Sequence, residues 1–153
     1  MKKLTIFTIV GIVYVCVEVF FSAITSMQLR LTGQSSVWMF MLGGVIGVIL
    51  SQLNKFKSIK LYYPINVILS GLLITLAELA SGIILNRICK FDIWDYSSSK
   101  YNFLGQIDAL HSTCWILISP FGFWLDDAIE YYMFGGKKPA SLFAYYIRNP
   151  DIT

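Results

Sequence analysis

Ionisable side chains stand inside apolar stretches at four positions of this chain. Glu18 and Glu78 lie within two long apolar runs, and Asp108 and His111 lie in a third. A carboxylate within a membrane helix costs at least about 2.5–3.5 kcal/mol at the helix centre, so it needs a polar partner, a watery cavity or a proton. These residues are therefore candidates for a site that binds an ion, a proton or a substrate amine.

A structural explanation of the two glutamates stays open. Glu18 and Glu78 could make interhelical hydrogen bonds, or pair with Arg30 and Arg87 at the membrane boundary.

The second pair of ionisable groups has helical spacing. Asp108 and His111 are three residues apart, which places them on one face of a helix. His111 is the only histidine and could bind a proton or a metal. The spacing does not define a metal site, so the metal stays unknown and no cofactor is expected.

The segment before Asp108 is the most distinctive of the chain. Its tryptophan and tyrosine residues favour a membrane interface, and its aspartate and serine residues can bond to the backbone of a turn. The asparagine at its end could cap the following helix. We expect an ordered re-entrant or lid-like loop that completes the site with Trp94, Asp95, Tyr96, Ser97 and Asn102. No Ser–His–acid pattern activates Ser97, so no catalytic residue is assigned.

Composition indicates which elements position these residues. Of 153 residues, 56% are hydrophobic and 14% are charged, against about 25% charged in an ordinary soluble domain. We predict a single all-α integral membrane domain, 1–153, because apolar runs of about 20 residues cross a bilayer. The four transmembrane helices are expected at 4–24, 37–53, 62–85 and 103–125, followed by an amphipathic tail, 126–153, on the membrane interface.

The distribution of basic residues predicts the orientation. With four spans, eight lysines and arginines fall on the side of the termini and four on the other side. The positive-inside rule then places both termini in the cytoplasm and the acidic residues in the outer half of the membrane. Because the basic residues are spread among loops, the chain is not expected to bind nucleic acid.

The two halves of the chain share a spacing of small and acidic residues. Gly11 precedes Glu18 by seven residues, as Gly71 precedes Glu78, and a serine–tryptophan segment begins or interrupts the next span in each half. This pattern is typical of two helical hairpins repeated in parallel, an arrangement known in transporters. Chance agreement in an apolar sequence is the alternative.

Several segments together resemble a known family. Trp94-Asp95-Tyr96-Ser97, Tyr101-Asn102-Phe103-Leu104-Gly105-Gln106-Ile107 and Trp115 are similar to the signature of the bacterial putative ABC-transporter type IV (CmpB-like) family. The eukaryotic relatives of that family form the transmembrane protein 229 group. The resemblance implies a multi-pass protein of the bacterial plasma membrane, and Val45-Ile46 departs from the more polar turn expected there.

Three functions remain open from the sequence. The first is a small permease-like protein that binds or moves a small solute or ion and lacks its own ATPase, since no Walker motif is present. It would need a separate ATPase subunit and a homo-oligomer, for which Gly43, Gly44, Gly47 and Gly71 could supply close helix contacts. The second is a non-catalytic scaffold or accessory subunit. The third, a membrane-embedded lipid-modifying enzyme, is less favoured, so an enzyme is uncertain and the weight falls against one.

Overall fold

The computed structural model describes residues 1–25, 35–55 and 63–147, and these ranges are mostly helical. Within these ranges, two helices are long and apolar enough to cross a membrane, Lys2–Ile24 and Tyr63–Ile88. They correspond to the first and third expected spans. Val37–Leu53 is apolar but shorter, and the last long helix is not among those that meet this criterion of length and composition.

The chain divides into two compact units, Met1–Ile49 and Leu50–Thr153, and each is described separately. The first unit holds helix α1 (Lys2–Thr25) and most of helix α2 (Val37–Lys55). The two helices approach closely at glycines: a side chain added to Gly11 would meet the Phe40 carbonyl oxygen at 2.7 Å.

Other glycines of this unit serve the same contact. Gly43, Gly44 and Gly47 of α2 lie against side chains of α1, namely Tyr14, Phe7 and Val10. These glycines are therefore used within the chain, and they carry no argument for a homo-oligomer.

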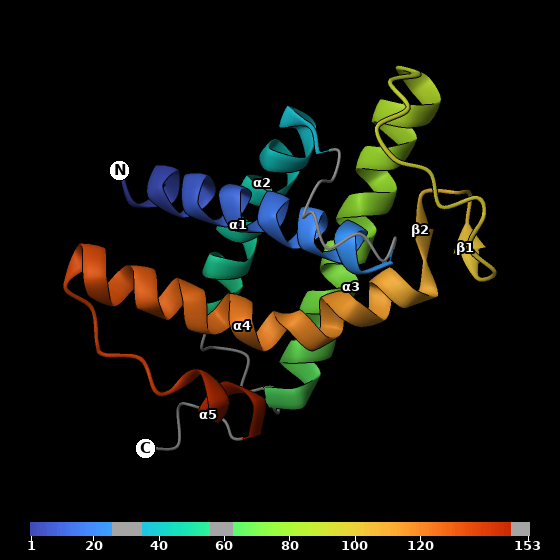
Figure 1. The fold of residues 1–153 in the computed structure, drawn as a ribbon. Coiled ribbons are helices and arrows are strands. Elements are labelled where there is room, and N and C mark those ends of the chain that lie inside the picture. Colours follow the sequence, from blue (N-terminus) through green and yellow to red (C-terminus); the bar gives the residue numbers. More distant parts are fainter. Residues whose placement is uncertain (26–34, 56–62, 148–153) are drawn as a thin grey trace. The chain divides into compact units, whose positions relative to one another are not determined.

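The second unit holds helix α3 (Tyr63–Gly82), the π-helix η1 (Ile83–Ile88), strands β1 (Asn102–Phe103) and β2 (Ile107–Asp108), helix α4 (Ala109–Phe134) and helix α5 (Leu142–Ile147). In Figure 1, α4 crosses α3, the β1–β2 hairpin lies at the start of α4, and α5 lies near the start of α3. Gly71 allows the crossing, because its Cα faces the backbone of Ile116 on α4. Apolar residues from α3, α4 and α5 form the core of this unit: Ile74, Trp115, Phe123, Ile129 and Tyr145.

The last long helix differs from the expected fourth span at both ends. A helix was expected from residue 103, but the segment forms an antiparallel hairpin in which Asn102 pairs with Asp108 and Phe103 with Ile107. The helix was expected to end at residue 125, but α4 continues to Phe134 and ends at Gly135, whose φ of 69° is the left-handed conformation that terminates helices. Residues 126–134 therefore belong to α4 and not to a separate tail.

The loop expected between the first two spans and the loop before the third fall mostly on residues 26–34 and 56–62, outside the described residues. Arg30, the suggested partner of Glu18, is among them.

Candidate functional site

One side chain of the π-helix anchors the loop that follows it. Asn86 is 8% exposed, and its Nδ2 donates to the Trp94 carbonyl oxygen at 3.0 Å and to Gln106 Oε1 at 2.8 Å. Its Oδ1 accepts from the Ile93 backbone N–H at 2.8 Å. Because a π-helix is wider than an α-helix, it changes the direction of the side chains that follow, and such turns are frequent at functional sites.

The same contacts join the two ends of the loop. Trp94 Nε1 donates to the Gln106 carbonyl oxygen at 3.0 Å, so the start of the loop and the residue before β2 are held together. Gly82 permits this approach, because a side chain there would meet Gln106 Oε1 at 2.5 Å and the Trp94 ring at 3.1 Å. The loop predicted to be ordered is therefore fixed on the end of the α3–η1 helix.

Asp95 and Ser97 form a turn inside this loop. Asp95 Oδ1 accepts from the Ser97 backbone N–H at 2.8 Å and from Ser97 Oγ at 2.5 Å. These bonds, the side-chain one first, lower the pKa of Asp95. Gly105 lies directly over the turn, because a Cβ at this residue would lie 2.5 Å from Ser97 Oγ. The carbonyl oxygen of Gly105 accepts from the Tyr96 N–H at 2.8 Å. In this arrangement, Asp95 and Ser97 shape the loop.

Asn102 also acts inside the loop. The sequence suggested that Asn102 caps α4, but it does not. Its Nδ2 donates to the carbonyl oxygens of Ser99 at 2.7 Å and Ser97 at 3.3 Å. Its Oδ1 accepts from the Gly105 N–H at 3.0 Å. Asp108 caps α4 instead. The capping prediction failed because the chain first makes a hairpin turn, which moves the helix start six residues along.

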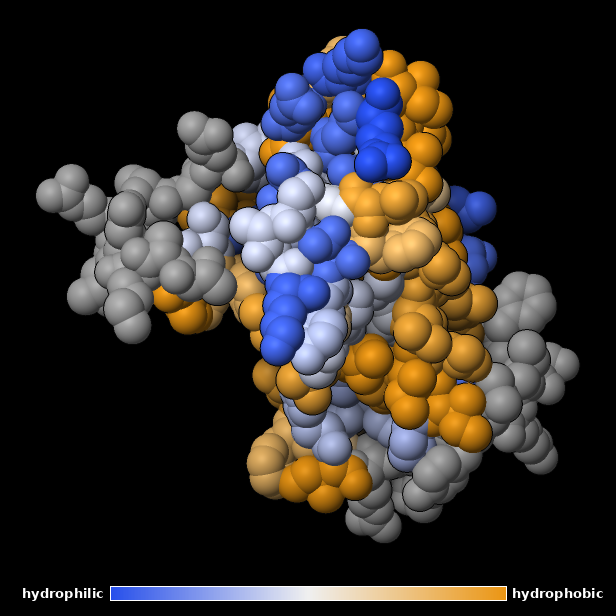
Figure 2. Space-filling model, turned by 90° about the vertical axis from the view of Figure 1, so that its right-hand side faces the viewer, coloured by the Kyte–Doolittle hydropathy of each residue, from blue (hydrophilic) through white to orange (hydrophobic). Residues whose placement is uncertain are grey.

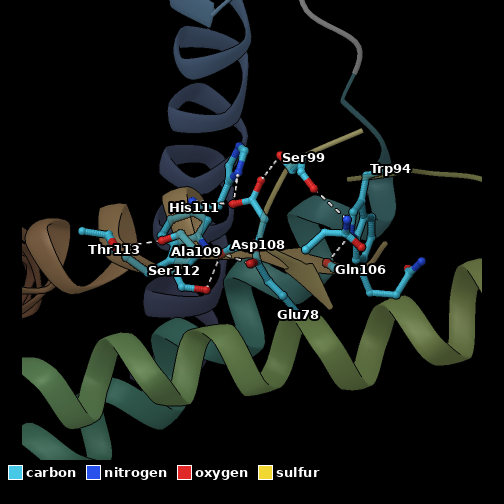
Figure 3. Close-up of polar contacts among 11 residues, drawn as sticks. Glu78, Trp94, Ser99, Gln106, Asp108, Ala109, His111, Ser112 and Thr113 are labelled. Carbon is cyan, nitrogen blue, oxygen red and sulfur yellow. Dashed lines mark hydrogen bonds and ion pairs between the residues drawn. The ribbon is translucent and has the colours of Figure 1, made fainter. Parts of the chain in front are cut away.

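Asp108 lies at the centre of the polar groups on this end of α4 (Figure 3). It is 3% exposed. Its Oδ1 accepts from the His111 backbone N–H at 2.8 Å and lies 2.8 Å from His111 Nδ1. Its Oδ2 accepts from Ser99 Oγ at 2.5 Å. Burial raises the pKa of Asp108, but the bonds from Ser99 and His111 together outweigh burial and lower it. The carboxylate is therefore held ionised.

The His111 ring is fixed on two sides. The Tyr96 ring stacks on it with centroids 4.3 Å apart, and Asp108 meets its Nδ1 edge. Because an ionised carboxylate only accepts hydrogen bonds, this contact requires the proton on Nδ1 and leaves Nε2 as the basic nitrogen of the neutral ring. The pair can accept a proton or contribute a ligand to a cation.

The order of the groups does not match acyl-transfer chemistry. In a Ser–His–Asp triad the histidine lies between the serine and the acid. Here Asp108 lies between Ser99 and His111. Among the described residues, no group of three or more His, Cys, Asp or Glu side chains is placed to hold a metal ion.

Glu78 is buried inside α3, one turn before Gly82. It is 2% exposed, and its Oε2 accepts a hydrogen bond of 2.8 Å from Trp115 Nε1 on α4. In Figure 3 the Glu78 side chain points from α3 toward the segment that carries Asp108. Arg87, its suggested partner, is exposed on η1.

The structure thus gathers eight of the nine candidate residues in the second unit, on the adjoining ends of α3 and α4 and in the loop between them. Glu18 lies in the first unit, half-buried on α1. Four further residues organise the site and were not among the candidates: Asn86, Ser99, Gln106 and Trp115. The sequence spacing could have indicated Trp115, since it follows His111 by four residues and so lies on the same helix face.

Comparison with known proteins adds one assignment. No curated protein and no solved structure matches the chain. A family model described as "Putative ABC-transporter type IV" matches residues 4–135. These residues cover nearly all of α1 and the whole of α3, η1 and α4, together with the loop of residues 93–106 that Asn86 anchors, called the anchored loop below. The resemblance in the tryptophan–aspartate loop is therefore confirmed, and the chain belongs to the putative ABC-transporter type IV family of membrane proteins.

Proposed function

We propose that the chain is a small permease-like membrane protein that binds a small cationic solute or ion at the polar cluster formed by Glu78, Asp108 and His111. The anchored loop covers this cluster from the membrane surface. The chain carries no G-x-x-x-x-G-K-[ST] motif, so ATP hydrolysis would come from a separate subunit.

The burial of Glu78 is the observation that carries the proposal. This carboxylate stands in the interior of an apolar helix of membrane-spanning length and is 2% exposed. Such a group is costly to bury unless its charge is balanced or it binds a proton, and intramembrane acids therefore mark ion and substrate sites in many membrane proteins. A cation that visits the cluster would balance this charge.

The sign of the surrounding charges favours a cation over an anion. Asp108 is held ionised by its hydrogen bonds, and the His111 ring presents its basic nitrogen. Two acids beside an imidazole match an ammonium group or a proton. They would repel an anion.

The proposal includes a topology. Four spans with both termini in the cytoplasm would place the cluster in the outer half of a bacterial plasma membrane, with the C-terminal segment on the cytoplasmic interface. Four helices enclose little volume, so a complete pathway would need further copies or a partner subunit.

Native mass spectrometry of the protein released from nanodiscs, combined with elemental analysis, tests the proposal. Glu78→Gln is the informative variant because the amide oxygen can still accept the Trp115 bond while the charge is removed. Asp92→Asn is the matched control: Asp92 is an exposed acid, and asparagine tolerates its φ of 48°.

We expect a stoichiometric cation or amine on the wild type and on Asp92→Asn, and its loss from Glu78→Gln, which should still fold and unfold cooperatively. If all three proteins carry only bulk lipid in equal amounts, the solute-binding proposal is wrong.

A non-catalytic scaffold or accessory subunit is the second candidate, and one observation favours it. Asp95 and Asp108 already accept hydrogen bonds from Ser97, Ser99 and His111 within the chain. In that case the acids would serve folding, and Glu78→Gln would leave every function of the protein intact.

A further inference from the structure

The tip of the β1–β2 hairpin holds a leucine in a backbone conformation that leucine disfavours. Leu104 has a φ of 56° and Gly105 a φ of 68°, and the Gln106 N–H donates to the Phe103 carbonyl oxygen at 3.1 Å. Positive φ at both central positions is characteristic of a type I′ turn, in which asparagine followed by glycine is the favoured pair. Gly105 fits this turn, but a side chain with a Cβ is strained at the first position unless it is asparagine or aspartate.

Packing within the chain does not account for this leucine. Leu104 is 42% exposed, and its apolar neighbours Phe103 and Tyr101 are 56% and 70% exposed. The leucine therefore adopts a costly conformation without being buried in the fold. A strained residue at an exposed tip indicates an interaction outside the folded unit.

The hairpin has a fixed position relative to the end of the apolar helix. Gln106 is bonded to Asn86 of η1 and to Trp94, so the tip cannot move away from the point where the Tyr63–Ile88 helix ends. The last residues of that helix are apolar and exposed as well, Ile84 at 53% and Ile88 at 69%. The anchor therefore holds an exposed apolar tip near the exposed apolar end of a helix of membrane-spanning length.

The residues beside the tip are those of a membrane interface. Lys100 Nζ lies 5.4 Å from the centroid of the Tyr101 ring, and Trp94 is half-buried in the same loop. Tryptophan, tyrosine and lysine are enriched where a membrane protein meets the headgroups. Figure 2, which views the side where the hairpin lies in Figure 1, shows hydrophilic and hydrophobic groups adjoining on this face.

We infer that the hairpin tip, defined by Tyr101, Phe103 and Leu104, inserts into the interfacial zone of the bilayer and takes lipid acyl chains as its partner. Insertion buries the leucine side chain and offsets the strain of the turn. It also sets the depth of the Asp108–His111 pair, which lies where β2 leads into α4.

A lipid partner fits this surface better than a protein partner. A stable protein interface uses roughly 20–30 residues a side, whereas the tip offers three apolar side chains. Lipid requires no complementary shape, so a small apolar tip next to a membrane helix is sufficient for insertion.

Fluorescence quenching in nanodiscs tests the inference. Leu104→Cys is made in a chain whose Cys16, Cys89 and Cys114 are replaced by alanine, and is labelled with an environment-sensitive fluorophore. Ser98→Cys is the matched control, since Ser98 is an exposed polar residue of the same loop. Quenching is measured with aqueous iodide and with phospholipids that carry a nitroxide near the headgroup end of the acyl chain.

We expect the label at residue 104 to be quenched by the nitroxide lipid and protected from iodide, and the label at residue 98 to show the reverse. Equal quenching of both labels by iodide would overturn the inference. Protection of residue 104 from both quenchers, in nanodiscs that hold one copy, would overturn it too, because the chain itself would then cover the tip.

A second variant separates insertion from folding. Leu104→Asn suits the turn but is polar, so we expect it to keep or raise the melting temperature while a label at Phe103→Cys loses its quenching by the nitroxide lipid. Unchanged lipid quenching in this variant would show that Leu104 does not hold the tip in the bilayer. Neither readout depends on a bound solute, so this test stands apart from that of the proposed function.

Discussion

Trp115 Nε1 donates a hydrogen bond of 2.8 Å to Glu78 Oε2, and both side chains are buried where α4 packs on α3. The bond joins the two long helices of the second unit through the carboxylate that the sequence singled out first. It also gives a reason for a tryptophan at this position: the indole combines a large apolar surface with one donor that can reach a buried acceptor.

Removal of this donor should destabilise the second unit. We expect Trp115→Phe to lower the free energy of unfolding by about 1–3 kcal/mol, because the buried carboxylate loses a hydrogen bond that water cannot replace. Glu78→Gln should cost less, since the amide oxygen still accepts the bond. Chemical denaturation in detergent measures both. A double-mutant cycle with Glu78→Leu, whose side chain accepts no hydrogen bond, is the control: if Trp115→Phe costs as much in that chain as in the wild type, the bond is not important for stability.

The loop should be released when its anchor is removed. Asn86→Ala deletes the contacts to Trp94, Gln106 and Ile93. We therefore expect the hydrogen-exchange rates of the amides in residues 93–106 to rise by about tenfold or more. Such a rise corresponds to a loss of roughly 1.4 kcal/mol in the free energy that protects these amides. Asn66→Ala on the same helix is the matched control. Equal exchange in the two variants would mean that Asn86 does not hold the loop.

Acid should weaken the start of α4 through Asp108. The pKa of this carboxyl is lower in the folded protein than its ordinary value, so the ionised form stabilises the fold above that ordinary value. This stability is lost as the pH falls through the folded pKa. We expect the melting temperature of the wild type to decline below about pH 4.

Asp108→Asn is the control for this prediction, because asparagine still caps the helix but carries no charge. Its melting temperature should be lower than that of the wild type at neutral pH, and the difference should shrink as the pH falls. A difference that stays constant from neutral to acidic pH would contradict the role assigned to the Asp108 charge. Asp95 does not confuse the comparison, since it is present in both proteins.

The sequence predicted some parts of the site because their physical costs are local. A carboxylate in an apolar run was expected to need a polar partner, a watery cavity or a proton, and Glu78 accepts a hydrogen bond from Trp115. Asp108 and His111 are three residues apart, and they are in contact. The turn-forming residues around Asp95 and Ser97 predicted an ordered loop, and they bond to each other as expected of such turns.

Other parts could not be predicted for an equally physical reason. The run from Phe103 to Asp108 is apolar and short, so its pattern does not distinguish a strand from a helix, and Leu104-Gly105 lacks the usual asparagine of a tight hairpin. Asn86 has no local signal, because its partners come from residues up to twenty positions away. By contrast, Gly135-Gly136 is a typical signal for a helix C-terminus, so the sequence did indicate that the last long helix continues beyond residue 125.

The short helix α5 should depend on one tyrosine hydroxyl. Tyr145 is 2% exposed; its hydroxyl donates to Asp127 Oδ2 at 2.5 Å, and its carbonyl oxygen accepts from the Tyr63 hydroxyl at 2.6 Å. These bonds join α5 to both α4 and the start of α3. A six-residue helix is too short to persist alone, so its order comes from this docking.

We therefore expect Tyr145→Phe to cost about 0.5–1.5 kcal/mol and to raise hydrogen exchange within residues 142–147, while the loop at residues 93–106 is unaffected. Tyr146→Phe removes a hydroxyl from the neighbouring residue, which is 50% exposed, and should change neither quantity. If both variants speed exchange of α5 equally, the hydroxyl of Tyr145 does not fasten the helix, and packing of its ring against α4 must do so.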